Sequence, residues 1–153
     1  MKVLFVGRFQ PVHKGHVYAI EEIIKRHHIV IAIGSIGKRN RENPFSFKER
    51  KEMLSRSIKG KFEIIGIRDN KSDDTWLGRI KNKCSFDAVA TGNPRVKEIF
   101  SGRGFKVIKP KMHMPEKYDA SKIRRLIREG REWRHLVPAG AKKIIEKHLL
   151  HSF

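Results

Sequence analysis

The chain has 153 residues, 39% of them hydrophobic, which is enough to bury one sizeable core, and it has no apolar run of the ~20 residues that would span a bilayer. A lone cysteine, Cys84, excludes an internal disulfide and agrees with a reducing, cytoplasmic compartment. The net charge of +19 favours phosphorylated or other polyanionic partners but does not choose among them.

The predicted elements alternate between strand and helix along the chain. An apolar strand without alternation is expected at 3–6, and a helix follows at 15–27 with Ile20 and Ile23 on one face. The next elements in order are a strand at 29–33, a helix at 47–58, a strand at 62–67, a helix at 74–83, a strand at 88–90, a helix at 96–101 and a strand at 105–108. From Ser121 the chain is expected to be mostly helical, with a break around Pro138 and Gly140.

Buried strands that alternate with amphipathic helices predict an α/β, Rossmann-like single domain over 1–153, with a C-terminal helical part at about 121–150. Its parallel sheet would have about five strands and helices on both faces. Such sheets bind ligands outside the carboxyl ends of the strands, where the strand order reverses. The segments 7–16, 34–45 and 91–94 are therefore the expected sites.

The first strand leads into Gly-Arg-Phe-Gln-Pro-Val-His-Lys-Gly-His at 7–16, where a helix begins. A helix N-terminus suits a phosphate because it offers free N–H groups and the positive end of the dipole. The imidazoles of His13 and His16 could donate hydrogen bonds to phosphate oxygens, and Arg8 and Lys14 add positive charge. The alternatives are an ordinary helix start or a zinc site, for which two histidines are too few ligands.

Residues 7–16 resemble the signature of the HxGH nucleotidyltransferase superfamily, in which two histidines contact the phosphates of ATP. The segment 118–124 resembles its second signature, a hydroxyl-rich turn that opens a late helix and is followed by Ile-Arg. There we expect Ser121 to cap the helix and Arg124 to point at the phosphates. An ordinary capped basic helix is the alternative.

The likeness to one branch, the archaeal-type nicotinamide-nucleotide adenylyltransferases, runs nearly end to end. It implies transfer of AMP from ATP to nicotinamide mononucleotide, giving NAD and pyrophosphate. Mg²⁺ would accompany ATP without a metal ligand from the protein, and relatives form homo-oligomers, commonly hexamers. It implies His13, His16, Arg8 and Arg124 as catalytic residues, an ATP site of Gly7, Phe9, Gln10, Lys14, Gly15, Arg41, Thr91, Gly92, Asn93 and Ser121, and an acceptor site of Trp76 and Asp69.

Several of these residues could instead have a purely structural role. Trp76 could be core, Asp69 could belong to a turn, and Arg41 could lie in a solvated loop. The chain also departs from the branch, because Asp119-Ala120-Ser121 replaces the usual Ser-Gly-Thr turn. The Asp119 carboxylate would repel a triphosphate unless it turned away to cap the helix or met Mg²⁺.

Two other functions compete with this one. Phosphopantetheine, FMN or glycerol 3-phosphate could be the acceptor in a related reaction. A basic nucleic-acid-binding protein is the alternative from another class, but it should show a basic stripe with interleaved aromatic residues. Here the basic residues are spread along the chain and only 8% of residues are aromatic, so a nucleic-acid partner is not expected.

Overall fold

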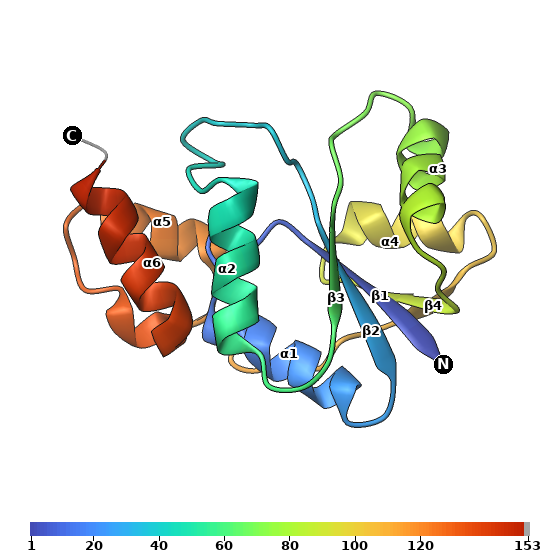
Figure 1. Ribbon diagram of the computed structural model, residues 1–153, viewed down its shortest axis with the longest axis horizontal. Coiled ribbons are helices and arrows are strands. Elements are labelled where there is room, and N and C mark those ends of the chain that lie inside the picture. The colour runs from blue at the N-terminus through green and yellow to red at the C-terminus, as the bar shows by residue number, and fades with distance from the viewer. Residues whose placement is uncertain (152–153) are drawn as a thin grey trace.

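The computed structural model describes residues 1–151, which form a five-stranded parallel sheet with the strand order β3-β2-β1-β4-β5 (Figure 1). The predicted strands are confirmed, and their ends shift by one residue at most. The strands are β1 (Lys2–Gly7), β2 (His28–Ile33), β3 (Glu63–Gly66), β4 (Ala88–Ala90) and β5 (Lys106–Ile108). All four strand pairs are parallel, as buried strands joined by helical crossovers require.

The helices follow the predicted periodicity. They are α1 (Lys14–Ile24), α2 (Phe47–Ser57), α3 (Asp73–Lys83), α4 (Pro94–Ser101), α5 (Ala120–Arg128) and α6 (Ala139–Leu150), with a short 3₁₀ helix, η1 (Arg134–Leu136), before the last. The predicted break includes Pro138, the N-cap of α6, but Gly140 lies inside that helix. A Cβ at Gly140 would lie 2.8 Å from the Arg56 carbonyl oxygen, so this glycine lets α6 pack closely on α2.

Helices cover both faces of the sheet, as predicted. The larger core lies under α1 and α2 and extends to α5 and α6, with buried Ile20, Met53 and Ile145. The smaller core lies under α3 and α4 and contains Leu77 and Phe100. Figure 1 shows α5 and α6 stacked outside α2, at the opposite end of the molecule from α3 and α4.

The strand order places the sheet's switch point between β1 and β4. The chain winds outward from β1 through β2 to β3, then returns to β4 beside β1 and continues to β5. Crossovers on opposite faces leave a crevice at the carboxyl ends of β1 and β4. Within residues 1–151, no helix has the length and apolarity needed to cross a membrane.

Candidate active site

A cleft of about 720 Å³ opens at the carboxyl ends of β1 and β4, where the strand order predicts a ligand site. The wall contains residues from the three predicted segments, 7–16, 34–45 and 91–94, together with residues from the turn before α3. Most of the predicted site residues line it: Gly7, Arg8, His13, Gly15, His16, Asp69, Trp76, Thr91, Gly92 and Asn93.

His13 and His16 form a reciprocal cap at the start of α1. The His16 backbone N–H donates to His13 Nδ1 at 3.3 Å, and the His13 N–H donates to His16 Nδ1 at 3.1 Å. The two rings stack with centroids 3.6 Å apart. Because both Nδ1 atoms accept hydrogen bonds, each neutral ring carries its proton on Nε2. The pair therefore has two Nε2–H donors available in a wall of the cleft.

Both imidazoles are held in the neutral form. Burial lowers the pKa of His13 to about 4, with the Asp119 carboxylate acting in the opposite direction. Burial, followed by repulsion from His13, keeps the pKa of His16 well below its ordinary value. At neutral pH the stacked rings are therefore uncharged hydrogen-bond donors, and the positive charge at this end of the cleft comes from Arg8.

Two glycines permit close approaches around this pair. A Cβ at Gly15 would lie 2.9 Å from His13 Cε1 and 3.1 Å from Tyr118 Cβ. A Cβ at Gly7 would lie 2.9 Å from Phe9 Cζ. Larger residues would push the imidazole of His13 or the ring of Phe9 out of place, which explains why glycine occupies both positions.

The opposite wall is built on the start of α4. Thr91 Oγ1 donates to the Val6 carbonyl at 3.4 Å and accepts from the Asn93 N–H at 3.1 Å. Asn93 caps α4, and its Oδ1 accepts from the N–H groups of Arg95 and Val96. Two helix N-termini, those of α1 and α4, thus open on the cleft and give it a positive potential.

Asp69 lies in a small polar network at the end of β3. Its Oδ1 accepts from Ser35 Oγ at 2.9 Å, and its Oδ2 pairs with Lys38 Nζ at 2.7 Å. Burial would raise the pKa of Asp69, but the hydrogen bonds from Lys38 and Ser35 outweigh it and leave that pKa below its ordinary value. Trp76 is half-buried and lines the cleft. Its indole packs edge-on against the Phe100 ring, with ring centroids 5.8 Å apart. It is therefore both a core residue and part of the cleft wall.

Arg124 is buried behind the cleft. Its Nη1 donates to the Gln10 carbonyl at 2.8 Å, and its Nη2 contacts Ser121 Oγ at 3.2 Å and Glu42 Oε2 at 3.0 Å. The guanidinium thus joins α5 to the loop after β1 and to the loop after β2. It does not line the cleft wall in this structure.

The other predicted ATP residues also lie outside that wall. Phe9 is buried, and both polar atoms of the Gln10 amide are bonded to the backbone of Phe45 at 2.9 Å. Lys14 and Arg41 are exposed. The sequence does not show these placements because each depends on contacts between distant segments.

The cap of α5 differs from the prediction. Asp119, not Ser121, is the N-cap, and its Oδ1 accepts from the N–H groups of Ser121 and Lys122 at 2.8 and 3.3 Å. An aspartate two residues earlier satisfies the free N–H groups, so the Ser121 hydroxyl is left for Arg124. Of the two roles foreseen for Asp119, the structure shows helix capping.

Several lining residues were not singled out from the sequence. They are Ser35, Lys38, Asp73, Arg95 and His113. Ser35 and Lys38 lie in a segment that was predicted to follow a strand end, so their position gave a signal. His113 comes from the loop between β5 and α5, whose return to the cleft no local pattern indicates, whereas Tyr118 at the end of that loop opens the second signature at 118–124.

The switch-point cleft and its paired imidazoles define a class, the nucleotide-binding α/β transferases, and a family model described as cytidylyltransferase-like matches residues 4–126. The nicotinamide-nucleotide adenylyltransferase of Methanococcus aeolicus is 35% identical, with 96% of this chain and 89% of that protein covered. That of Archaeoglobus fulgidus is also 35% identical, with 96% and 91% covered. This chain belongs to the cytidylyltransferase-like family and, within it, to the nicotinamide-nucleotide adenylyltransferases.

The fold is also that of a solved bifunctional protein from Francisella tularensis. That protein is an NMN adenylyltransferase/ADP ribose pyrophosphatase, and its structure contains AMP and a manganese ion. The TM-score is 0.83 at 22% sequence identity, with 99% of this chain covered. The chain spans about half of that protein, since 49% of its length is covered.

Proposed function

We propose that this chain transfers AMP from ATP to nicotinamide mononucleotide, giving NAD and pyrophosphate. The observation that carries the proposal is the reciprocal His13–His16 cap, which leaves the proton on Nε2 in two histidines that line the cleft. Membership of the nicotinamide-nucleotide adenylyltransferases supports this choice of acceptor. In this reaction an acceptor phosphate oxygen attacks the α-phosphorus in line, and the bond to the bridging oxygen of pyrophosphate breaks.

No protein nucleophile is needed, so the residues of the chain act by positioning and by stabilising charge. The Nε2–H groups of His13 and His16 would donate to phosphate oxygens, where negative charge increases in the transition state. Arg8 would neutralise the triphosphate from the end of β1. The backbone and side chains of Thr91, Gly92 and Asn93 would hold the adenosine of ATP.

The acceptor would lie toward Trp76 and Asp69. The indole offers a flat face to the nicotinamide ring, while the Asp69 carboxylate can accept a hydrogen bond from a carboxamide N–H. Arg124, Ser121 and Gln10 would hold the loops after β1 and β2 in place without contacting the phosphates. Exposed Lys14 and Arg41 would reach the triphosphate only on the solvent side.

A divalent cation, which we propose is Mg²⁺, fits this cleft as a companion of the triphosphate. The acidic side chains in the cleft wall already have partners, because Asp69 pairs with Lys38 and Asp73 pairs with Arg95. Residues 1–151 contain no group of three or more His, Cys, Asp or Glu side chains placed to hold a metal. Mg²⁺ prefers water and phosphate oxygens, and when bound it would neutralise charge on the phosphates.

The test measures pyrophosphate release and dinucleotide formation with ATP and Mg²⁺. The acceptor panel contains nicotinamide mononucleotide, its nicotinic acid form, FMN, phosphopantetheine and glycerol 3-phosphate. We expect NAD and an equal amount of pyrophosphate with nicotinamide mononucleotide. Turnover with FMN alone would reassign the acceptor, and no turnover with any acceptor would refute the transferase function.

We further propose that residues 1–153 act as one nucleotidyltransferase domain in a homo-oligomer, with a hexamer as the expected form. Light scattering coupled to gel filtration measures the assembly directly. A monomer with full turnover would show that the cleft of one chain is sufficient.

A further inference from the structure

The guanidinium of Arg50 lies entirely inside the protein, behind the cleft. Arg50 is on the first turn of α2 and has 0% exposed surface. Within residues 1–151 it forms no ion pair with a carboxylate at 4.0 Å or less. Burial, followed by repulsion from Arg8, lowers its pKa to about 10, so it remains charged at neutral pH. A buried cation without a bonded anion is costly, and its hydrogen bonds must account for it.

These hydrogen bonds join the ends of two neighbouring strands. Arg50 Nη1 donates to the carbonyl of Arg8 and to the carbonyl of Gly34, each at 2.8 Å. The first follows β1 and the second follows β2. Arg50 Nε donates to the Ser46 carbonyl at 3.2 Å, which ties the side chain to the start of its own helix.

The residue after each of these two carbonyls has an unusual backbone conformation. Phe9 has φ of 55° and Ser35 has φ of 53°, and neither is a glycine. Non-glycine residues persist in this region only where the surroundings fix them, at a cost of about 1–3 kcal/mol each. Arg50 holds the peptide that precedes each one, so a single side chain fixes both turns.

Both turns deliver residues to the cleft. Arg8 lines it directly, and Ser35 lines it while donating its hydroxyl to Asp69 at 2.9 Å. We propose that Arg50 is a positioning residue for adenylyl transfer, which sets the two strand ends that carry Arg8 and Ser35. This inference rests on the proposed function and adds a residue that does not line the cleft itself.

The test compares three variants with the wild type, using nicotinamide mononucleotide and ATP. Arg50→Met removes the charge and every hydrogen bond. Arg50→Lys keeps a charge, but its ammonium ends one bond short of Nη1 and it lacks the Nε donor that bonds the Ser46 carbonyl. Met53→Ala is the matched control, because it weakens α2 at a core side chain that is also 0% exposed and has no polar group to bond either strand end.

We expect both Arg50 variants to lower kcat about 100-fold, as small misplacements of reacting groups do, with a much smaller change in KM for ATP. Met53→Ala should lower Tm and leave kcat close to the wild-type value. Melting curves define a temperature at which all three variants are folded, and kcat is measured there.

Any other result would overturn either the positioning role of Arg50 or the proposed function. Full kcat in Arg50→Lys would show that the charge alone matters and would overturn the positioning role. An equal loss of kcat in Met53→Ala and Arg50→Met would assign the effect to general weakening of α2. An inactive wild type would overturn the proposed function and this inference with it, whereas an active Arg50→Met would overturn only the inference.

Discussion

The imidazoles of His13 and His16 each do two things at once. Through Nδ1 each ring caps the start of α1, and through Nε2 each keeps a donor for a ligand. The stacking at 3.6 Å makes a doubly protonated pair unfavourable, because the two positive charges would be in contact. Helix capping therefore sets the tautomer that the proposed chemistry uses.

His16→Ala should reduce turnover by a factor of about 100 or more, because it removes one donor to the developing charge and half of the cap. The measurement is kcat with nicotinamide mononucleotide under saturating ATP. His28→Ala is the matched control, since His28 is exposed at the start of β2, beyond the C-terminal end of α1. Wild-type turnover in a folded His16→Ala protein would contradict the role of the imidazole pair.

Stability should fall as the pH is lowered below about 6.5. The pKa of His13 is about 4 in the folded protein and near 6.5 when unfolded, so between these values the unfolded state binds more protons. His13 alone would cost up to about 3 kcal/mol of the free energy of unfolding by pH 4. Urea melts from pH 7 to pH 4 measure this slope, and His13→Gln should flatten it. An unchanged slope in that variant would place the proton uptake elsewhere.

At the scale of an element, the start of α5 shows what Asp119 does in the Asp119-Ala120-Ser121 turn that departs from the family pattern. The Asp119 carboxylate is bonded to the N–H groups of Ser121 and Lys122, and Arg124 of the same helix is joined to Glu42. Asp119 therefore caps α5, and its negative charge compensates the helix dipole. A hydroxyl residue at the same place could form an equivalent cap.

Asp119→Ala should cost about 1 kcal/mol of stability, whereas Asp119→Ser should cost much less because serine also caps a helix. Thermal melts of the two variants measure the difference. We expect Asp119→Ser to keep or raise turnover, since it removes a negative charge beside the histidines. A large loss of turnover in Asp119→Ser with an unchanged Tm would show that the carboxylate takes part in the reaction.

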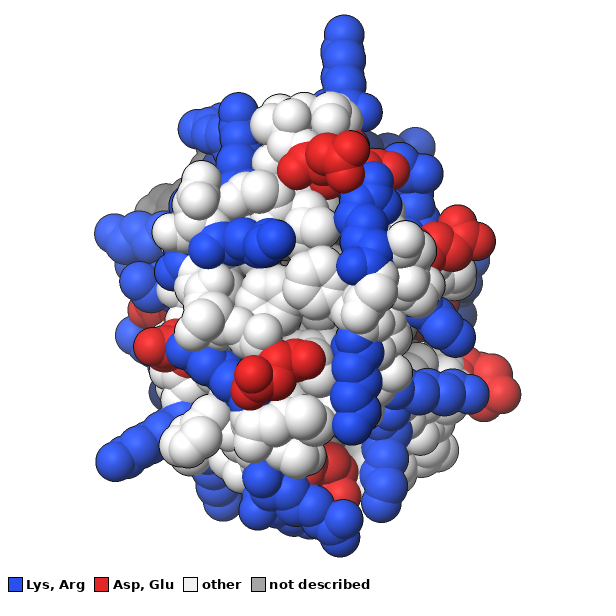
Figure 2. All heavy atoms as spheres, turned by 90° about the vertical axis from the view of Figure 1, so that its right-hand side faces the viewer, with Lys and Arg blue, Asp and Glu red and all other residues white. Residues whose placement is uncertain are grey.

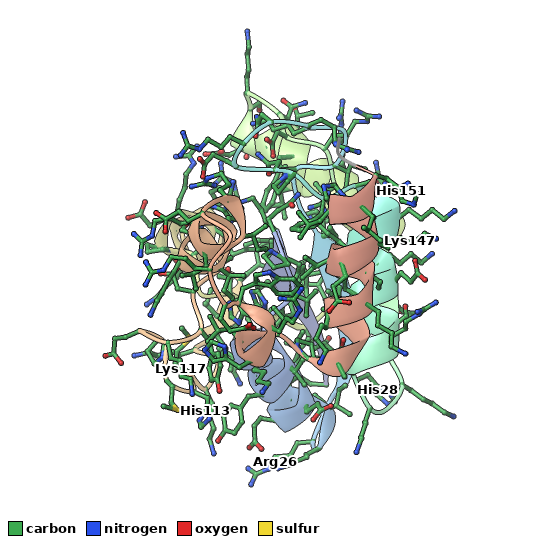
Figure 3. All side chains as sticks on the ribbon, turned by 90° about the vertical axis from the view of Figure 1, so that its left-hand side faces the viewer. Arg26, His28, His113, Lys117, Lys147 and His151 are labelled. Atoms are coloured by element: carbon green, nitrogen blue, oxygen red, sulfur yellow. The ribbon has the colours of Figure 1, made fainter. Side chains whose placement is uncertain are left out.

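At the scale of the whole molecule, the positive charge is spread over the surface. Figure 2 shows Lys and Arg around the whole of one face, with Asp and Glu scattered among them. Figure 3 shows Lys147 and His151 on α6, and Arg26 and His28 at the other end of the same view.

Basic side chains line a groove of about 920 Å³ formed by α2 and α6. Its lining includes Arg39, Lys48, Arg56, Lys143 and Lys147, with Glu49 and Glu52 as the acidic residues. Both glutamates have partners, because Glu49 contacts His148 at 2.8 Å and Glu52 pairs with Arg56 at 2.6 Å. The remaining cations repel one another, and this repulsion lowers the stability of the folded state.

Lys143→Glu should therefore raise the stability by about 0.5 kcal/mol at low salt. Lys143 and Lys147 are exposed and one turn apart on α6, so the change turns a repulsive pair into an attractive one. In 1 M salt the gain should nearly vanish, since charges are then screened within about 3 Å. Lys109→Glu, an exposed site after β5 with the same change of charge, is the control. An equal gain in the control would mean that net charge, and not the groove, limits stability.

Local pattern determined the order and type of the elements, because each is encoded by neighbouring residues. Apolar runs marked the strands, and helical periodicity marked helices such as that at 47–58, in which the structure buries Met53 and Leu54. The parallel order and the rule for switch points then located the cleft. The His13–Gly15–His16 spacing indicated a phosphate site for the same reason, since the reciprocal hydrogen bonds of the two histidines lie within one turn of helix.

Only the tertiary structure decided which long-range contacts these residues make. It bonds Gln10 to Phe45, turns Arg124 toward Glu42, and joins Arg50 to the ends of two strands. These contacts link residues that are 16 to 82 positions apart in the sequence. A side chain with several possible partners takes those that the packing of the sheet and helices brings within hydrogen-bond distance, and no local pattern records that distance.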